Sequence, residues 1–298
     1  MPRNILITGA AGYIGGSILA DILSKHPEVT KKQVLAAVRT DEQAKALSIH
    51  GINVLKLDLS DEHAVVNEIF THKISVIVHA ANSIDPGLTL HLINGLAKQK
   101  EATGKPTYFI HTSGLSAFYA NSGWPCTINT DTDAVFETEK KFADSYPVRK
   151  SLQAVHISDL TALYCRIIHA ALNKEEIPSG KEGYYFAVAH DLDMWEFQDH
   201  LAATMKARGL VTSDKSVVYP SDEFAAEAID VPVEFLSILY KSGGHFTATR
   251  PQSIGWKPKW NKERFLKNVD ADIGDVVELG KAKSSLVDSL FAAVGRAR

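Results

Sequence analysis

The chain is poor in cysteine and has no uniform apolar run long enough to cross a bilayer. Its two cysteines, Cys126 and Cys165, lack CxxC spacing and a nearby histidine cluster, which argues against a disulfide framework or a zinc site. We therefore expect no metal, and a reducing, cytoplasmic setting fits best. The uncharged run over residues 5–20 is shorter than the ~20 residues of a spanning helix and is interrupted by glycines, so we expect no targeting or membrane segment.

An excess of positive charge is also missing. Lysine and arginine total 32 against 35 aspartates and glutamates, so no global positive field exists to hold nucleic acid or an anionic membrane. The chain has 12 histidines, but His79, His111 and His156 fall near predicted strand ends without metal-ligand spacing, and we expect them to be packed or hydrogen-bonded. A composition that is 45% hydrophobic and 22% charged excludes a disordered or collagen-like chain.

The first half of the sequence contains a regular alternation of strand and helix patterns. Short apolar, β-rich runs predict strands over residues 4–8, 33–39, 52–58, 74–81 and 107–113. Apolar residues with helical spacing predict helices over residues 13–23, 41–50, 61–70 and 86–102. Because the strands are apolar enough to be covered on both faces, the pattern predicts an α/β fold with a doubly wound parallel sheet.

The second half is less regular. Its patterns predict helices over residues 158–172, 194–208 and 231–240 and from about residue 262 onward, and a strand over residues 183–189. No internal repeat or low-complexity linker occurs. The change of pattern predicts a first domain over residues 1–150 and a smaller, mainly helical part over residues 151–298.

A glycine-rich turn joins the first predicted strand to the first helix. In "TGAAGYIGG", three glycines are spaced GxxGxxG. Such a turn lets a pyrophosphate approach a backbone without Cβ atoms, and the helix N-terminus offers N–H groups and a dipole to the anion. Four further strand–helix alternations favour dinucleotide binding over a plain loop. The predicted contacts are Thr8, Gly9, Gly12, Tyr13, Ile14 and Gly15.

The residue at the end of the second predicted strand discriminates between dinucleotides. A carboxylate there would accept a hydrogen bond from the ribose 2′-hydroxyl, whereas a cation would pair with a 2′-phosphate. The residue is Arg39, and Lys45 can add positive charge, although Asp41 and Glu42 oppose it. We therefore predict NADP in preference to NAD. The alternative is that Arg39 is a solvated strand end.

Residues that follow the third and fourth predicted strands would lie at the same edge of the sheet. Asp58 is placed to meet the adenine edge or, alternatively, to cap the next helix. Ala80 and Ala81, followed by Asn82, lie on the carboxyl edge, where ligands bind in open α/β sheets. Small residues at this place let a cofactor pass close.

These segments resemble the extended short-chain dehydrogenase/reductases, and within them the fungal NmrA-like and NAD-dependent epimerase/dehydratase-type proteins. The likeness is carried by "ITGAAGYIGG" (7–16), "AAVRTDEQAKAL" (36–47), "VIVHAAN" (76–82), "IHTSG" (110–114), "VHISDLTALY" (155–164) and "GWKPKW" (255–260). The resemblance implies a Rossmann domain over residues 1–150 that binds NAD(P), a substrate-binding part over residues 151–298, a small-molecule substrate and a homodimer as the common assembly.

The resemblance also implies a Ser, Tyr and Lys trio beside the nicotinamide. In such a trio the tyrosine exchanges a proton with the substrate oxygen, the lysine lowers the tyrosine pKa, and the serine orients the carbonyl. Ser113 takes the serine place, with a turn hydroxyl as the alternative, and Tyr146 and Lys150 have YxxxK spacing. Pro147 would put Tyr146 at the very start of a helix. Tyr119 is a rival phenol with no lysine at the right distance.

Lys150 and Val155 are separated by only four residues. In the family, a sixth strand and a substrate loop lie between the matching segments, and a parallel crossover needs a dozen or more residues, so we predict an internal deletion after Lys150. The sequence predicts an NADP(H)-dependent oxidoreductase that reduces a carbonyl, or oxidises an alcohol, of a small organic molecule. The alternatives are an epimerase or dehydratase with bound NAD, and a catalytically degenerate regulator that senses a dinucleotide.

Overall fold

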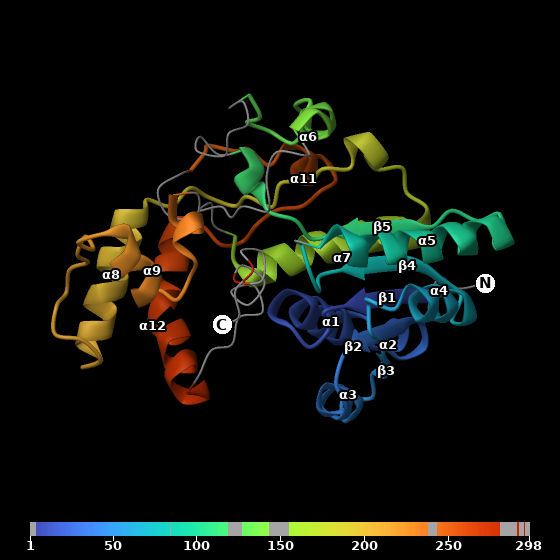
Figure 1. Cartoon of the computed structure of the whole chain (residues 1–298), viewed down its shortest axis with the longest axis horizontal. Helices are drawn as coiled ribbons and strands as arrows, with labels where there is room; N and C mark the ends of the chain where they lie inside the picture. The colour runs from blue at the N-terminus through green and yellow to red at the C-terminus, as the bar shows by residue number, and fades with distance from the viewer. Residues whose placement is uncertain are drawn as a thin grey trace. The chain divides into compact units, whose positions relative to one another are not determined.

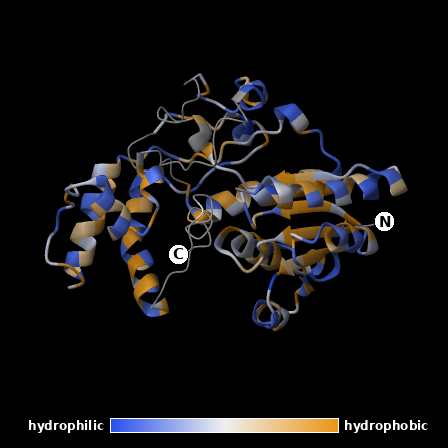
Figure 2. Ribbon diagram, viewed as in Figure 1, coloured by the Kyte–Doolittle hydropathy of each residue, from blue (hydrophilic) through white to orange (hydrophobic). Residues whose placement is uncertain are grey.

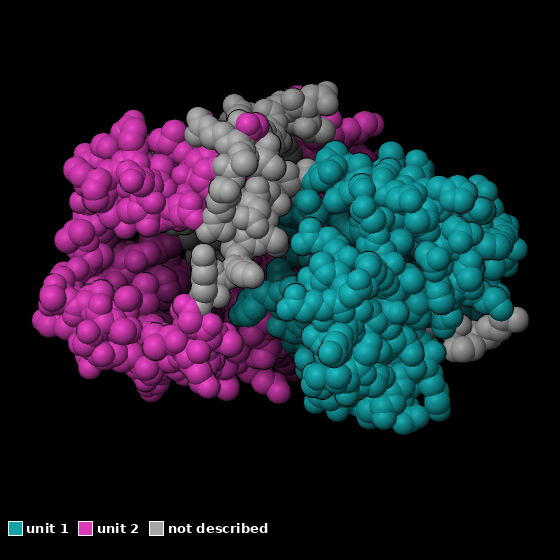
Figure 3. Space-filling view, turned by 60° about the horizontal axis from the view of Figure 1, so that its bottom comes forward, with its two compact units in different colours: residues 1–113, 160–177 teal, residues 114–159, 178–298 magenta. Residues whose placement is uncertain are grey.

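The computed structural model describes residues 4–83, 85–118, 127–142, 155–237 and 243–280, with Phe291 and Gly295. The chain divides into two compact units, residues 1–113 with 160–177 and residues 114–159 with 178–298 (Figure 3). Among the helices of the described ranges, none combines the length and the apolar composition that crossing a lipid bilayer requires.

The first unit is built on a five-stranded parallel sheet (Figure 1). The strand order is β3-β2-β1-β4-β5, and the strands are β1 (Asn4–Thr8), β2 (Val34–Val38), β3 (Asn53–Lys56), β4 (Ile74–His79) and β5 (Tyr108–His111). All five coincide with predicted strands, and the predicted doubly wound α/β fold is confirmed.

Helices cover both faces of this sheet. They are α1 (Tyr13–Lys25), α2 (Pro27–Gln33), α3 (Asp41–Ser48), α4 (Glu62–Thr71), α5 (Pro86–Thr103) and α7 (Ile157–Asn173). Successive strand residues point to opposite faces, so Val76 packs with Ile18 of α1 and Ile168 of α7, whereas Ile77 packs with Leu92 of α5. Figure 2 shows the apolar strands between more polar helices.

The helix α7 explains why the units do not follow a single cut of the chain at residue 150. Residues 160–177 return to the sheet of the first unit, while residues 114–159 cluster with the second unit. Tyr164 and Ile168 of α7 belong to the core formed on the α1 face of the sheet. The first unit is therefore completed by a segment that the chain supplies late.

The second unit is mainly helical in the part that the structure describes. Its helices are α6 (Val135–Phe142), α8 (Met194–Ala207), α9 (Asp222–Ala228), α11 (Thr249–Ser253) and α12 (Lys262–Leu279), with 3₁₀ turns η1 (Leu115–Phe118), η4 (Gly180–Glu182) and η5 (Val233–Phe235). The predicted helices at residues 158, 194 and 262 are confirmed. Where residues 231–240 were predicted as a helix, the described part contains only the short turn η5.

The predicted strand over residues 183–189 is wrong. This segment joins no strand of the sheet, because its backbone is held by a side chain instead: the Phe186 N–H donates to Oδ2 of Asp131 at 3.0 Å. Aromatic and β-branched residues favoured a strand, but they fill a core in which Phe186 packs against Phe118 and Phe246.

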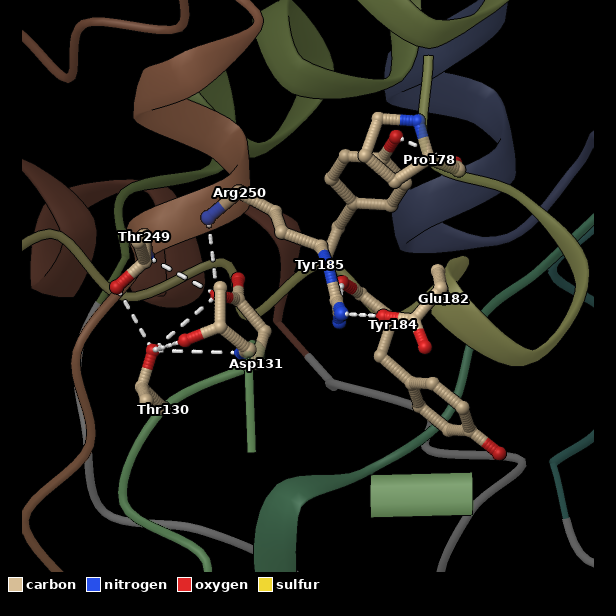
Figure 4. A network of polar contacts seen from close by, with 9 residues as sticks. Thr130, Asp131, Pro178, Glu182, Tyr184, Tyr185, Thr249 and Arg250 are labelled. Carbon is tan, nitrogen blue, oxygen red and sulfur yellow. Dashed lines mark hydrogen bonds and ion pairs between the residues drawn. The ribbon is translucent and has the colours of Figure 1, made fainter. Parts of the chain in front are cut away.

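Asp131 organises the second unit from a fully buried position (Figure 4). Besides Phe186, its carboxylate accepts the backbone N–H groups of Thr249 at 3.1 Å and Arg250 at 2.9 Å. The buried Arg250 guanidinium in turn forms an ion pair with Glu182. One carboxylate thus joins three segments that are far apart in the sequence, and its hydrogen bonds offset the cost of burying its charge.

Asp159 plays a similar part near the start of α7. Its buried carboxylate accepts the backbone N–H groups of Lys259 and Trp260 at 2.8 to 2.9 Å, and its carbonyl accepts Nε1–H of Trp256 at 2.8 Å. The segment "VHISDL" and the segment "GWKPKW" are therefore physically joined through this residue.

Candidate functional site

The glycine turn between β1 and α1 leaves the start of α1 without a side-chain cap. Gly12 is the N-cap residue, and no acidic residue lies in the first turn. By contrast, a side-chain oxygen accepts a backbone N–H at the start of α3, α4 and α5, from Thr40, Asp61 and Asp85 respectively. The positive end of the α1 dipole therefore meets no protein carboxylate in its first turn, an arrangement suited to an anion.

Gly9 allows the turn after β4 to lie directly against the turn after β1. Its φ is +69°, and a Cβ atom there would lie 2.6 Å from the carbonyl oxygen of Ala80 and 2.8 Å from Cα of Ala81. A Cβ on Gly15 would lie 2.3 Å from the carbonyl oxygen of Gly9. The structure thus brings together four of the predicted cofactor residues, at the carboxyl ends of two adjacent strands.

The other predicted residues of this turn differ in exposure. Thr8 is fully buried, and its Oγ1 lies 2.7 Å from Nδ1 of His79, so its side chain is used within the sheet. Tyr13 is 75% exposed at the start of α1. Ile14 is partly buried and packs against the core on the α1 face. Of these three side chains, only that of Tyr13 is largely accessible to a ligand.

The strand order places this turn at the topological switch point of the sheet. From β1 the chain continues to β2 and β3 on one side, and β4 and β5 follow on the other side. Thr8 and His79 are register partners and the last residues of β1 and β4. In open α/β sheets, ligands bind outside the carboxyl ends of the strands at this point.

Arg39 follows β2 directly and is exposed. Its backbone N–H donates to Oε1 of Gln43, which fixes the start of α3. Lys45 on α3 is also exposed. Asp41 was expected to oppose these cations, but Lys56 at the end of β3 binds both of its carboxylate oxygens at 2.8 Å. In the described ranges neither the Arg39 nor the Lys45 side chain forms an ion pair, so both can meet a phosphate.

Asp58 lies two residues beyond β3 and is exposed. It accepts hydrogen bonds from the Ser60 N–H at 2.9 Å and the Ser60 hydroxyl at 2.7 Å, which hold its pKa below the ordinary value, with a smaller contribution from Arg39. The alternative that Asp58 caps the next helix is wrong, because Asp61 accepts the Ala64 N–H and caps α4. Asp58 and Arg39 are thus within electrostatic reach of each other.

Ser113 follows β5 and is exposed, and its role as the trio serine stays a prediction. The hydroxyl of its neighbour Thr112 lies 2.6 Å from the hydroxyl of Tyr164, whose pKa is raised by burial. Tyr164 is a core residue of α7 rather than an exposed phenol. Tyr146 and Lys150 lie outside the described residues.

Tyr119 and the predicted deletion after Lys150 also concern residues beyond the described ranges. The deletion, and with it the completeness of the trio, therefore stays a prediction.

The structure brings His79 and His111 to the same edge of the sheet. They are register partners in β4 and β5, with ring centroids 5.3 Å apart. Burial lowers the pKa of both, and that of His79, further lowered by His111, falls to about 4. The His79 ring is packed, as expected, whereas His111 is exposed and stacks on His79 and Phe109. Their position at the switch point was not predicted, and the only signal in the sequence was a histidine at the end of each apolar strand.

Other reactive groups are few in the described part of the chain. Its described ranges hold no group of three or more histidine, cysteine, aspartate or glutamate side chains that could bind a metal ion. Cys165 is a free thiol whose pKa burial raises to about 12, so it is protonated at neutral pH and is a poor nucleophile.

Comparison with known proteins gives a family match for the first unit and a fold match for the chain. Residues 5–100, less than half of the chain, match the NAD dependent epimerase/dehydratase family. No curated protein matches the sequence.

Among solved structures, L-threonine dehydrogenase from Clostridium difficile is 15% identical with a TM-score of 0.55, covering 92% of this chain and 98% of that chain. NADPH-dependent quinone oxidoreductase from Escherichia coli, complexed with NADPH, is 21% identical with a TM-score of 0.53, covering 92% and 99%. A partial consensus L-threonine 3-dehydrogenase is 12% identical with a TM-score of 0.58, covering 92% and 100%. At these identities the likeness shows the fold. The chain therefore has the Rossmann-like fold of these dehydrogenases and reductases, and its first hundred residues are similar to the NAD dependent epimerase/dehydratase family.

Proposed function

We propose that the protein is an NADP(H)-dependent oxidoreductase that reduces a carbonyl group, or oxidises the matching alcohol, of a small organic molecule. The observation that carries the proposal is the uncapped start of α1, packed through Gly9 against Ala80 and Ala81 at the switch point of the sheet. A diphosphate fits this place by charge and by the lack of side-chain bulk.

The residues at the neighbouring strand ends support the choice of NADP. Arg39 is exposed beside the glycine turn, and the carboxylate closest to it in sequence, Asp41, is bound by Lys56. Lys45 adds a second exposed cation on α3. A 2′-phosphate would pair with these cations, whereas the 2′-hydroxyl of NAD would find no carboxylate at the place that Arg39 occupies.

The reaction assigned to this site is hydride transfer, which a bound nicotinamide would supply. In the proposal Ser113 donates a hydrogen bond to the substrate oxygen, and Tyr146 gives that oxygen its proton during reduction. Lys150 lowers the pKa of the Tyr146 hydroxyl, so that the proton is mobile near neutral pH. We assign the cofactor to the domain over residues 1–150 and the substrate to the part over residues 151–298.

The proposal can be tested in two steps on the full-length chain. NADPH and NADH are titrated by nucleotide fluorescence, and NADPH oxidation is then followed with a panel of ketones, aldehydes and quinones. We expect tighter binding of NADPH and oxidation with at least one carbonyl compound. Tight binding with no oxidation across the panel would instead favour a dinucleotide-sensing regulator.

Two tyrosine variants separate chemistry from folding. Tyr146→Phe should lower kcat at least about a hundredfold, because it removes the proton donor. Tyr164→Phe removes the hydrogen bond to Thr112 from a buried core position and should lower stability slightly with little change in kcat. An unchanged kcat in Tyr146→Phe would exclude Tyr146 from the mechanism.

A second candidate function is an epimerase or dehydratase that keeps its nucleotide bound. The similarity of residues 5–100 to the NAD dependent epimerase/dehydratase family favours it. Arg39 argues against it, since an acidic residue at that place would suit NAD better. Net consumption of free NADPH during turnover would indicate an oxidoreductase. An epimerase or dehydratase would show none, because it restores its bound nucleotide in each cycle.

A further inference from the structure

His79 lies at the junction of β1 and β4, the two strands between which the strand order reverses. It ends β4, and its ring nitrogen Nδ1 is 2.7 Å from the hydroxyl of Thr8, which ends the adjacent strand β1. The next residue, Ala80, donates its N–H to the Thr8 carbonyl and contacts Gly9. The imidazole is therefore next to the turns that we assign to the nucleotide.

Among the residues that the structure describes, none forms a hydrogen bond with the second nitrogen of this ring. Nε2 of His79 is buried and unpaired, and the whole residue is 0% exposed. The backbone of Asn82 acts to raise the pKa of the ring, against the larger lowering by burial and by His111, but it does not meet the geometry of a hydrogen bond to Nε2. A buried polar atom left unpaired is destabilising, so a native chain that retains one calls for an explanation.

The protonation state of the ring limits which ligand groups Nε2 can hydrogen-bond. His111 stacks on one side of the ring, and burial together with His111 keeps the pKa of His79 well below neutral. A neutral imidazole carries one proton, so Nε2 is either a donor or an acceptor, depending on which role Nδ1 takes toward Thr8. It can therefore match a hydroxyl or an amide group, and it needs no ionic partner.

We propose that a nicotinamide nucleotide bound at the switch point completes the hydrogen bonding of Nε2, through one of its hydroxyl or amide groups or through a water that it orders. The inference rests on the proposed function. Because the ring is fully buried, the contact passes through a water or follows a small shift of the turn after β4. His79 is thus a positioning residue that couples nucleotide binding to the β1–β4 junction.

Two amide variants separate the two nitrogens. The amide of His79→Asn reaches about as far as Nδ1 and can keep the Thr8 contact, whereas the amide of His79→Gln reaches about as far as Nε2. Loss of one neutral hydrogen bond predicts NADPH affinity about two- to tenfold weaker in His79→Asn, with a smaller loss in His79→Gln. The matched control is Ser75→Ala, because the Ser75 hydroxyl is also buried and unpaired but lies at the opposite end of β4. It should leave NADPH affinity unchanged.

A measurement on the wild-type chain avoids any loss of folding in the variants. With ¹⁵N-histidine labelling, saturating NADPH should shift the Nε2 resonance of His79 and leave Nδ1, which stays bound to Thr8, nearly unchanged. The inference is wrong, while the proposed function stands, if NADPH binds without shifting the Nε2 resonance and His79→Asn binds NADPH as tightly as the wild type does. If the wild-type chain binds neither NADPH nor NADH, both are wrong.

Discussion

Asp131 and Asp159 of the second unit differ from His79 of the first unit in how far their buried polar atoms are paired. In the second unit, Asp131 accepts three backbone N–H groups and Asp159 accepts two. In the first unit, the buried imidazole of His79 uses one nitrogen and leaves the other unpaired, and α1 begins without a side-chain cap. The two carboxylates hold distant segments of the chain together, whereas Nε2 of His79 and the uncapped start of α1 lie at the carboxyl edge of the sheet, where a ligand would bind.

The difference shows how structural and ligand-binding polar groups can be told apart. A buried group whose donors and acceptors are all paired within the chain has no capacity left for a ligand, so its loss should affect stability. A group left incomplete beside the ligand site, such as Nε2 of His79, lowers stability but can gain a partner on binding, so its loss should affect affinity.

Replacement of Asp131 should have the largest effect on stability. Asp131→Ala would leave the N–H groups of Phe186, Thr249 and Arg250 without their acceptor in a buried place, at a cost of about 4 kcal/mol or more. Denaturant unfolding measures the loss. Asp131→Asn, which keeps one acceptor oxygen, should lose less. If the two variants were as stable as the wild type, Asp131 would not organise the second unit.

Replacement of Gly9 should damage both stability and binding. Gly9→Ala would bring a Cβ atom within 2.6 Å of the Ala80 carbonyl oxygen at a φ of +69°, so the two turns must separate, at a cost of about 3 kcal/mol. The matched control is Gly104→Ala, whose φ is +63° but whose Cβ would meet nothing within 4 Å. It should cost only about 1 kcal/mol and leave NADPH affinity unchanged. Equal losses in the two variants would mean that backbone conformation, rather than the close approach, requires Gly9.

Stability should fall as the pH falls from about 6.5 to about 4. The pKa of His79 in the folded chain is lowered from 6.5 to about 4, so over this range the unfolded chain binds a proton that the folded chain does not. The free energy of unfolding that is lost through this residue approaches about 3 kcal/mol. Urea unfolding at a series of pH values should show a shallower dependence in His79→Gln than in the wild type. The exposed His50→Gln is the control, and an equal slope in all three chains would contradict the prediction.

Arg39 should decide between the two nucleotides, with the smallest effect on the fold. Arg39→Asp places a carboxylate where a 2′-phosphate would lie, so the Kd for NADPH should rise at least about tenfold while that for NADH falls. Lys32→Ser, an exposed lysine paired with Glu28 on α2, is the control and should change neither Kd. If Arg39→Asp had the same ratio of NADPH Kd to NADH Kd as the wild type, Arg39 would not contact the bound nucleotide.

The sheet and the glycine turn were predictable from the sequence because their signals are local. The period of apolar residues indicates strands and helices, and three spaced glycines after a strand indicate a turn for a diphosphate. The helix α2 was not predicted, because Pro27 looks like a helix breaker although it is tolerated in the first turn. Residues 183–189 were misassigned because the partner of their backbone is a distant aspartate.

The fine structure of the site depends on tertiary contacts that no local pattern contains. The ion pair of Lys56 with Asp41 joins the end of β3 to the start of α3, and it engages one of the two carboxylates, Asp41 and Glu42, that were expected to oppose the cations. Likewise the contact of His79 Nδ1 with Thr8 follows from the register of β1 against β4. Such details follow from the folded arrangement of strands rather than from residue spacing.

If the β1–α1 turn and the adjoining strand ends bind a phosphorylated nicotinamide nucleotide, isothermal titration calorimetry of the folded, full-length chain with NADPH should detect it. We expect saturable heat with one nucleotide per chain and a weaker response to NADH. Absence of heat with both nucleotides, from a chain shown to be folded by its circular dichroism, would contradict it.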